Sequence, residues 1–167
     1  MKATLIAILC TASTLIAGDR IPNQLIDYRE FVRIAGKVAP LREQRRVSED
    51  KFMELAAQPG TLVLDARSAD KFAMRHIRGA VSLPFTDFTE ASLAAAIPTK
   101  ATRVLIYCNN NFRGSPVSLA AKSAPASLNI STFIALTTYG YTSVYELGPL
   151  LDVATTKLPF AGSEVTK

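Results

Sequence analysis

Cys108 is the residue whose setting in the sequence points most directly to chemistry. It follows the apolar run Arg103 to Tyr107 (RVLIY) and precedes Asn109, Asn110, Asn111, Phe112, Arg113 and Gly114. A thiol becomes a strong nucleophile when backbone N–H groups, a helix N-terminus or a cation stabilise its thiolate. Asparagine and glycine let a loop turn several N–H groups inward, and Arg113 adds a permanent cation. Such a loop would also hold a small dianion without a metal. We therefore expect Cys108 to be catalytic and residues 109–114 to bind substrate.

The N-terminal segment bears on whether this cysteine forms a disulfide or stays a free thiol. Lys2 precedes Ala3 to Ala17, an uncharged apolar run too short to span a bilayer comfortably. This pattern predicts a cleaved signal peptide over residues 1–18, with an uncleaved apolar anchor as the alternative. Because Cys10 lies within the run, the exported chain, periplasmic or secreted, would keep one of its 2 cysteines. One cysteine forms neither an internal disulfide nor a cysteine-rich zinc site, so it is a candidate reactive thiol.

The charge balance bears on the partners. The chain has a formal net charge of +5, and loss of Lys2 with the signal would leave a mild positive excess. This excess favours a small anionic substrate. Arg42, Arg45 and Arg46 cluster without interleaved aromatic residues, as in a solvated charged segment rather than a nucleic-acid site. We expect no nucleic-acid partner and, after signal cleavage, no membrane partner. The oligomeric state is left open.

The elements expected along the chain alternate between strands and helices. Residues 24–37 have the apolar spacing of an amphipathic helix, and Pro40 with Arg42 to Arg46 reads as a linker. Ser48 is the expected N-cap of the next helix. Further helices are expected over residues 69–75, 91–96, 116–122 and 130–139, and strands over residues 61–65, 80–83, 103–107 and 143–147. Strands separated by helices predict a parallel α/β sheet, which binds ligands beyond the carboxyl ends of its strands.

Several short motifs together resemble the rhodanese-like family. They are Leu64-Asp65-Ala66-Arg67, His76-Ile77-Arg78-Gly79-Ala80 with Pro84, the strand leading into Cys108, and Gly140, Tyr141, Val144, Leu147 and Gly148. The resemblance covers about residues 47–160. It implies a single-domain α/β fold with a central parallel sheet flanked by helices. We expect a signal at 1–18, a helical extension and linker at 19–46, the rhodanese-like domain at 47–162 and a tail at 163–167.

The resemblance also implies an activity, sulfur transfer without a cofactor. Cys108 would take a sulfane sulfur from a small anionic donor such as thiosulfate, carry it as a persulfide, and pass it to a thiol or cyanide-like acceptor. Asp65 and Arg67 would pair near the sheet in a structural role, and His76 would be a structural histidine.

Three alternatives stay open beside sulfur transfer. Phosphatases of the family resemble Cys-x5-Arg, whereas Cys108 to Arg113 is Cys-x4-Arg with Gly114 in the place of the later arginine. A non-catalytic binding module is the main rival, and a redox partner would lack a second, resolving thiol.

The chain also departs from the family pattern in three places. Asn111 replaces the usual loop glycine, and Gly148-Pro149 stands where paired glycines are common. About thirty residues separate Cys108 from Gly140, which implies an insertion that would cover or enlarge the pocket. If the insertion begins inside the loop, Arg113 would point elsewhere.

Overall fold

A five-stranded parallel sheet forms the centre of the molecule. The computed structural model describes residue 21 and residues 23–165, so the predicted signal peptide lies outside the described residues. The sheet has the order β1-β7-β5-β2-β4. Its strands are β1 (Arg46–Val47), β7 (Val144–Leu147), β5 (Arg103–Tyr107), β2 (Thr61–Asp65) and β4 (Val81–Ser82). All four neighbouring pairs are parallel, which confirms the predicted fold class.

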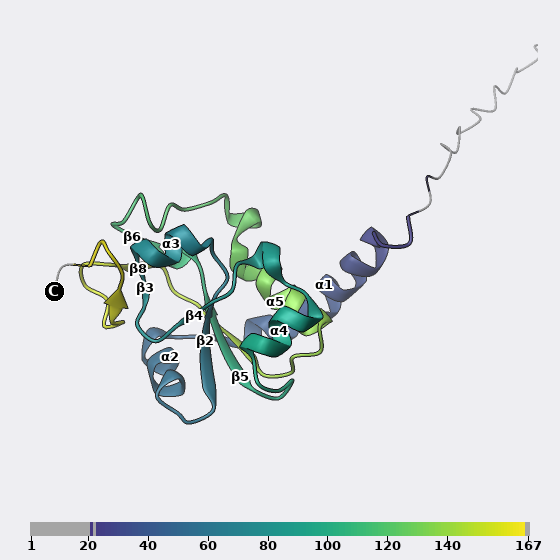
Figure 1. The fold of residues 1–167 in the computed structure, drawn as a ribbon, viewed down its shortest axis with the longest axis horizontal. Coiled ribbons are helices and arrows are strands. Elements are labelled where there is room, and N and C mark those ends of the chain that lie inside the picture. Colours follow the sequence, from purple (N-terminus) through teal and green to yellow (C-terminus); the bar gives the residue numbers. More distant parts are fainter. Residues whose placement is uncertain (1–20, 22, 166–167) are drawn as a thin grey trace, which may run out of the picture.

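Helices cover both faces of this sheet (Figure 1). The apolar cluster on one face contains side chains of α1 (Tyr28–Gln44), α4 (Glu90–Ala96) and α5 (Leu128–Thr138). The cluster on the other face contains side chains of α2 (Glu49–Ala56) and of the C-terminal residues. The remaining elements are α3 (Ala69–Met74), the pair β3 (His76–Ile77) and β9 (Phe160–Ala161), the pair β6 (Phe112–Arg113) and β8 (Leu151–Asp152), and the short helices η1 (Phe85–Asp87), η2 (Asn109–Asn111) and η3 (Ala124–Ala126).

Strand β5 lies at the middle of the sheet and sets the position of Cys108. Successive strand residues point to opposite faces, so Val104 and Ile106 join one apolar cluster while Leu105 and Tyr107 join the other. All four are at most 1% exposed. A strand buried on both faces is fixed in register, because a shift by one residue would exchange its two faces. The chain therefore delivers Cys108 to the carboxyl edge of the sheet, between the ends of β2 and β7.

The first helix is longer than the sequence indicated. The predicted helix over residues 24–37 and the linker after it are wrong in their bounds: α1 runs from Tyr28 to Gln44 and contains Pro40. Proline lacks an N–H, so the helix forgoes one hydrogen bond there. Contacts with the sheet outweigh this loss, because Val38 is buried and Arg42 donates a 2.6 Å hydrogen bond to the buried Glu146. Arg46, the last residue of the predicted linker, instead begins β1.

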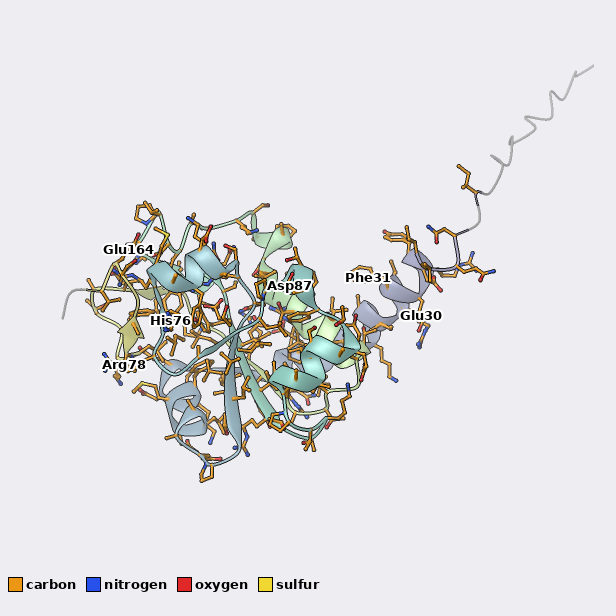
Figure 2. All side chains as sticks on the ribbon, viewed as in Figure 1. Glu30, Phe31, His76, Arg78, Asp87 and Glu164 are labelled. Atoms are coloured by element: carbon orange, nitrogen blue, oxygen red, sulfur yellow. The ribbon has the colours of Figure 1, made fainter. Side chains whose placement is uncertain are left out.

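The N-terminal half of α1 extends beyond the sheet. Figure 2 shows Glu30 and Phe31 on the part of the helix that projects from the rest of the molecule. Phe31 is half exposed, and Leu25 and Tyr28 are more exposed still. Among the described residues, no helix combines the length and the apolar content needed to cross a membrane.

The predicted helix over residues 116–122 is also wrong: residues 116–119 form turns and residues 120–122 have no regular secondary structure. A helix would need their carbonyl groups for its own N–H groups. Instead, Lys71 and Arg67 donate to the carbonyl oxygens of Val117 and Ser118. Side chains from elsewhere therefore replace the helical hydrogen bonds. The segment from β6 to the start of α5 runs past α3 across the top of the view (Figure 1).

Candidate active site

The candidate site lies where β5 ends and α5 begins. Cys108 is 1% exposed, and its sulfur lies 3.5 Å from the hydroxyl oxygen of Ser127. Ser127 is the N-cap residue of α5, yet its side chain makes no hydrogen bond to the helix backbone. The hydroxyl is therefore free to donate to the sulfur. A helix N-terminus also favours negative charge nearby, so this position suits a thiolate.

Asn111 joins three elements around the thiol. Its side-chain oxygen accepts hydrogen bonds from the backbone N–H of Cys108 and from the side chain of Asn129 in α5, both at 2.9 Å. Its amide nitrogen donates to the carbonyl oxygen of Leu147 at 2.7 Å, at the end of β7. Asn111 is 5% exposed. The residue that stands in place of the usual loop glycine thus fixes the cysteine relative to α5 and β7.

The other two asparagines hold the segment between β6 and α5, which contains the predicted insertion and is called the inserted segment. Asn109 donates to the carbonyl oxygen of Ala120 at 2.6 Å. Asn110 bonds Lys122 in both directions, donating to its carbonyl oxygen at 2.8 Å and accepting from its N–H at 3.0 Å. The run of three asparagines is therefore a set of side-chain clamps, and the sequence-based prediction of substrate contacts by these residues stays a prediction.

A cavity of about 540 Å³ adjoins this site at the carboxyl edge of the sheet. The ends of β2 and β5, the chain after β4, α3, α5 and the inserted segment contribute its walls. Cys108 is not among the lining residues, but its neighbour Asn109 is. The lining residues are Ala66, Arg67, Ser68, Lys71, Pro84, Phe85, Thr86, Asn109, Ala120, Ala121, Lys122 and Leu128.

The charged residues that line this cavity are all cations. Arg67 is neutralised by Asp65, which leaves Lys71 and Lys122 as the net charges on the walls. Lys71 lies on α3 and also donates to the carbonyl oxygen of Val117. Lys122 comes from the segment between β6 and η3. A cavity with two lysines and no lining carboxylate attracts small anions.

Arg113 is placed differently from the expectation that it lines the pocket. It lies on β6, its guanidinium is 3.3 Å from Asp152 on β8, and its side chain is 70% exposed. It does not line the cavity. Phe112 is buried against Tyr107 in the opposite apolar cluster, and Gly114 has a φ of +87° that turns the chain away from β6. Of the six loop residues predicted to bind substrate, only Asn109 lines the cavity.

A buried network beneath the cavity confirms the predicted pairing of Asp65 with Arg67. Two guanidinium nitrogens of Arg67 donate to the carboxylate, one of them at 2.5 Å. Burial by itself lowers the pKa of Arg67, but the hydrogen bonds and charge of Asp65 outweigh it, so this pKa is raised. Tyr107 donates to the same carboxylate at 2.5 Å. Its pKa is raised well above 10, first by burial and then by the charge of Asp65, so the phenol stays protonated.

His76 has a structural position. Its ring stacks on Phe72 with a centroid separation of 3.8 Å, and its Nδ1 lies 2.7 Å from the carbonyl oxygen of the same residue. That contact requires a proton on Nδ1, because a carbonyl oxygen only accepts. His76 is the first residue of β3, and in Figure 2 it lies close to α3. Both ring contacts are with Phe72, as expected for a structural histidine.

Sequence reasoning did not single out Ser127, Lys71 or Lys122 for this site. Ser127 and Lys122 lie in the predicted insertion, whose path the sequence does not indicate. Lys71 carries a weak signal, since it lies one turn into a helix that follows the Asp65–Arg67 motif at the carboxyl edge of the sheet.

The fold and the site together define a class of protein: a parallel α/β domain that presents a cysteine at the carboxyl end of its central strand. The family model for the rhodanese-like domain matches residues 48–147. The chain belongs to the family of rhodanese-like domains.

The chain is also similar to several individual proteins. The chain is 28% identical over 95 residues to the thiosulfate sulfurtransferase PspE of Escherichia coli (strain K12), covering 57% of this chain and 76% of that protein. Among solved structures, a rhodanese with anions from E. coli shows 21% identity, covers 62% of this chain and 99% of that chain, and has a TM-score of 0.42. A variant of EanB in complex with hercynine shows 17% identity, covers 70% of this chain and 27% of that chain, and has a TM-score of 0.51. At that identity, the likeness concerns the fold alone.

Proposed function

We propose that this protein is an exported sulfurtransferase that carries sulfane sulfur as a persulfide on Cys108. The observation that supports this most is the position of Cys108, at the end of β5, beside the N-terminus of α5 and next to a cavity lined by Lys71 and Lys122. Membership of the rhodanese-like family and similarity to a thiosulfate sulfurtransferase support the same activity. The apolar run at residues 3–17 is the basis for export to the periplasm or the exterior.

The reaction proceeds in two displacements. The Cys108 thiol first loses its proton to solvent. The thiolate then attacks the outer sulfur of thiosulfate, so a sulfur–sulfur bond forms to Cys108 as the bond to the sulfonate group breaks and sulfite leaves with the electron pair. A thiolate or cyanide then attacks the terminal sulfur of the persulfide. The carbon–sulfur or sulfur–sulfur bond to the acceptor forms, and Cys108 leaves as thiolate, so no external oxidant or reductant is consumed.

The site contributes charge stabilisation to both displacements. Each has an anionic sulfur at Cys108, and the N-terminus of α5 and the Ser127 hydroxyl both favour negative charge there. Lys71 and Lys122 would hold the departing sulfite or the incoming dianion. Asn111 keeps the cysteine backbone in place throughout.

The test is mass spectrometry of the full-length protein after incubation with thiosulfate, followed by cyanide. We expect a gain of one sulfur atom on the peptide containing Cys108, and its loss as thiocyanate forms. Cys108→Ser should remove both signals. Cys10→Ser is the matched control, because it removes the other cysteine and should leave both signals intact. Thiocyanate formation that survives in Cys108→Ser would refute the proposal.

Burial of the thiol favours one rival, a non-catalytic binding module. Cys108 is 1% exposed, whereas a nucleophile must meet its substrate. The rate at which iodoacetamide alkylates Cys108 at neutral pH separates the two. A catalytic cysteine should react faster than a free thiol, because its site stabilises the thiolate, and a merely buried one should react more slowly. The phosphatase alternative is less well supported, because Arg113 does not line the cavity.

A further inference from the structure

Residues 120–126 form an exposed segment between two firm attachments. All seven residues are exposed. On the N-terminal side, Ser118 and Leu119 are at most 2% exposed, and Arg67 bonds the Ser118 carbonyl. On the C-terminal side the chain enters α5 at Leu128. The segment therefore spans the gap between α3 and α5 with both ends fixed.

Side chains of the cysteine loop hold this segment down. Among the described residues, its hydrogen bonds to other parts of the protein come from Asn109, at Ala120, and from Asn110, at Lys122. The remaining bonds, from Ala126 to Ser123 and from Ser127 to Ala124, are local turns. Apolar anchors are lacking as well, because none of the seven is buried. Segments with few buried contacts and exposed hydrogen bonds open at low free energy.

The segment also forms the outer wall of the cavity beside Cys108. Ala120, Ala121 and Lys122 line that cavity, and Cys108 itself does not. The two hydrogen bonds between the Asn110 side chain and the Lys122 backbone fix the position of Lys122 in the cavity wall. The segment thus adds a cation to the cavity beside the thiol.

We propose that residues 120–126 are a cover that limits Cys108 to small anionic sulfur donors, with Asn110 holding it closed and Lys122 supplying the charge. This inference rests on the proposed sulfur transfer at Cys108. In the closed position a small dianion fits the cavity of about 540 Å³ that Lys71 and Lys122 line. A protein-bound or bulky donor reaches the sulfur only after the cover opens.

The size limit is tested by thiol alkylation, which needs no sulfur-transfer activity. Rates at Cys108 are compared for iodoacetamide and for a maleimide joined to a long polyethylene glycol, in a Cys10→Ser background. In Asn110→Ala the alkylation rate with the maleimide, divided by the rate with iodoacetamide, should rise about tenfold. The reason is that only one of the three hydrogen bonds between the asparagine side chains and residues 120–126 remains, the one from Asn109. Asn110→Asp keeps the acceptor for the Lys122 N–H and should give an intermediate ratio. Ser123→Ala lies on the same segment, makes no side-chain cap bond, and should leave the ratio unchanged.

If Asn110→Ala keeps the far-ultraviolet spectrum of the folded protein and its ratio of alkylation rates is unchanged, the proposed cover is wrong. An equal rise in Ser123→Ala would overturn it too, because the effect would then be general loosening of the segment. Neither result bears on whether thiosulfate yields a persulfide, so failure of the cover and failure of the proposed activity are distinguishable.

The charge limit is tested with sulfate, an inert dianion. Sulfate should slow iodoacetamide at Cys108, and Lys122→Ala should weaken this protection several-fold. Lys37→Ala removes the same charge from exposed α1 and should leave protection unchanged. Equal protection in wild type and Lys122→Ala, or an equal loss in Lys37→Ala, would overturn the role of Lys122.

Discussion

Removal of Arg67 should destabilise the protein strongly, because the buried carboxylate of Asp65 would lose its cation. Arg67 is 3% exposed and Asp65 is fully buried. Arg67→Ala also removes the hydrogen bonds to the carbonyl oxygens of Ser118 and Arg75. Loss of one partner of a buried ion pair costs about 3–5 kcal/mol. For a chain of this size, that corresponds to a fall in Tm of roughly 6–20 °C.

The chain contains a matched control for this substitution. Arg33 and Glu30 form an ion pair with the same shortest distance as Arg67 and Asp65, 2.5 Å, but on the exposed surface of α1. Exposed pairs are screened by water and restrict flexible side chains, so they contribute little. Arg33→Ala should therefore leave Tm nearly unchanged. Distance is equal in the two pairs, and burial is the variable that differs.

Urea unfolding followed by circular dichroism measures both effects. We expect a large fall in the transition midpoint for Arg67→Ala and almost none for Arg33→Ala, with similar slopes in the two transitions. Similar small shifts for both variants would refute the reasoning, because burial would then not determine the contribution of the pair. Arg67→Ala should also speed alkylation of Cys108, since its bond to Ser118 anchors one end of the inserted segment.

Two further predictions concern backbone geometry and high pH. Gly162 has a φ of +121° and an added Cβ would overlap the backbone of Met74, so Gly162→Ala should lower the free energy of unfolding by at least about 1–3 kcal/mol. Gly36 lies in open space within α1, so Gly36→Ala should raise the free energy of unfolding by about 0.5–1 kcal/mol. Urea midpoints that shift in the same direction in both variants would contradict this. The raised pKa of Tyr107, from burial and then Asp65, favours the protonated phenol in the folded state, so its contribution is complete below about pH 10 and falls as pH rises through the folded-state pKa. Absorbance titration should show a late tyrosinate component that Tyr107→Phe removes, and its persistence in that variant would count against the assignment.

The central sheet was predictable because its signals are local. The runs at residues 61–65 and 103–107 contain the uninterrupted apolar stretches 62–64 and 104–107, as expected of strands buried on both faces, and both strands occur as predicted. The N-cap at Ser48 was also correct: its side chain accepts a 3.2 Å hydrogen bond from the N–H of Lys51. The course of α1 through Pro40 was not predictable, since it depends on Glu146, a carboxylate about a hundred residues away in the sequence.

The position of Cys108 could be predicted from the sequence, but the hydrogen bonds made by the three asparagines that follow it could not. Asparagine tolerates left-handed backbone, which favoured a loop of inward N–H groups; yet the described residues include no non-glycine residue with positive φ. The three side chains instead bond carbonyl groups of Ala120, Lys122 and Leu147, partners that lie 11 to 36 positions along the chain. Such pairings follow from tertiary structure and leave no trace in local spacing.

The same reasoning explains why the cation assigned to the loop is found elsewhere. The pairing of β6 with β8 brings Arg113 to Asp152, and this pairing depends on residues after the end of the main sheet. The chain then crosses to α3 before it returns to α5, and in doing so it carries Lys122 to the wall of the cavity that Lys71 also lines. The positive charge that the sequence-based prediction assigned to Arg113 is therefore supplied beside the thiol by Lys71 and Lys122.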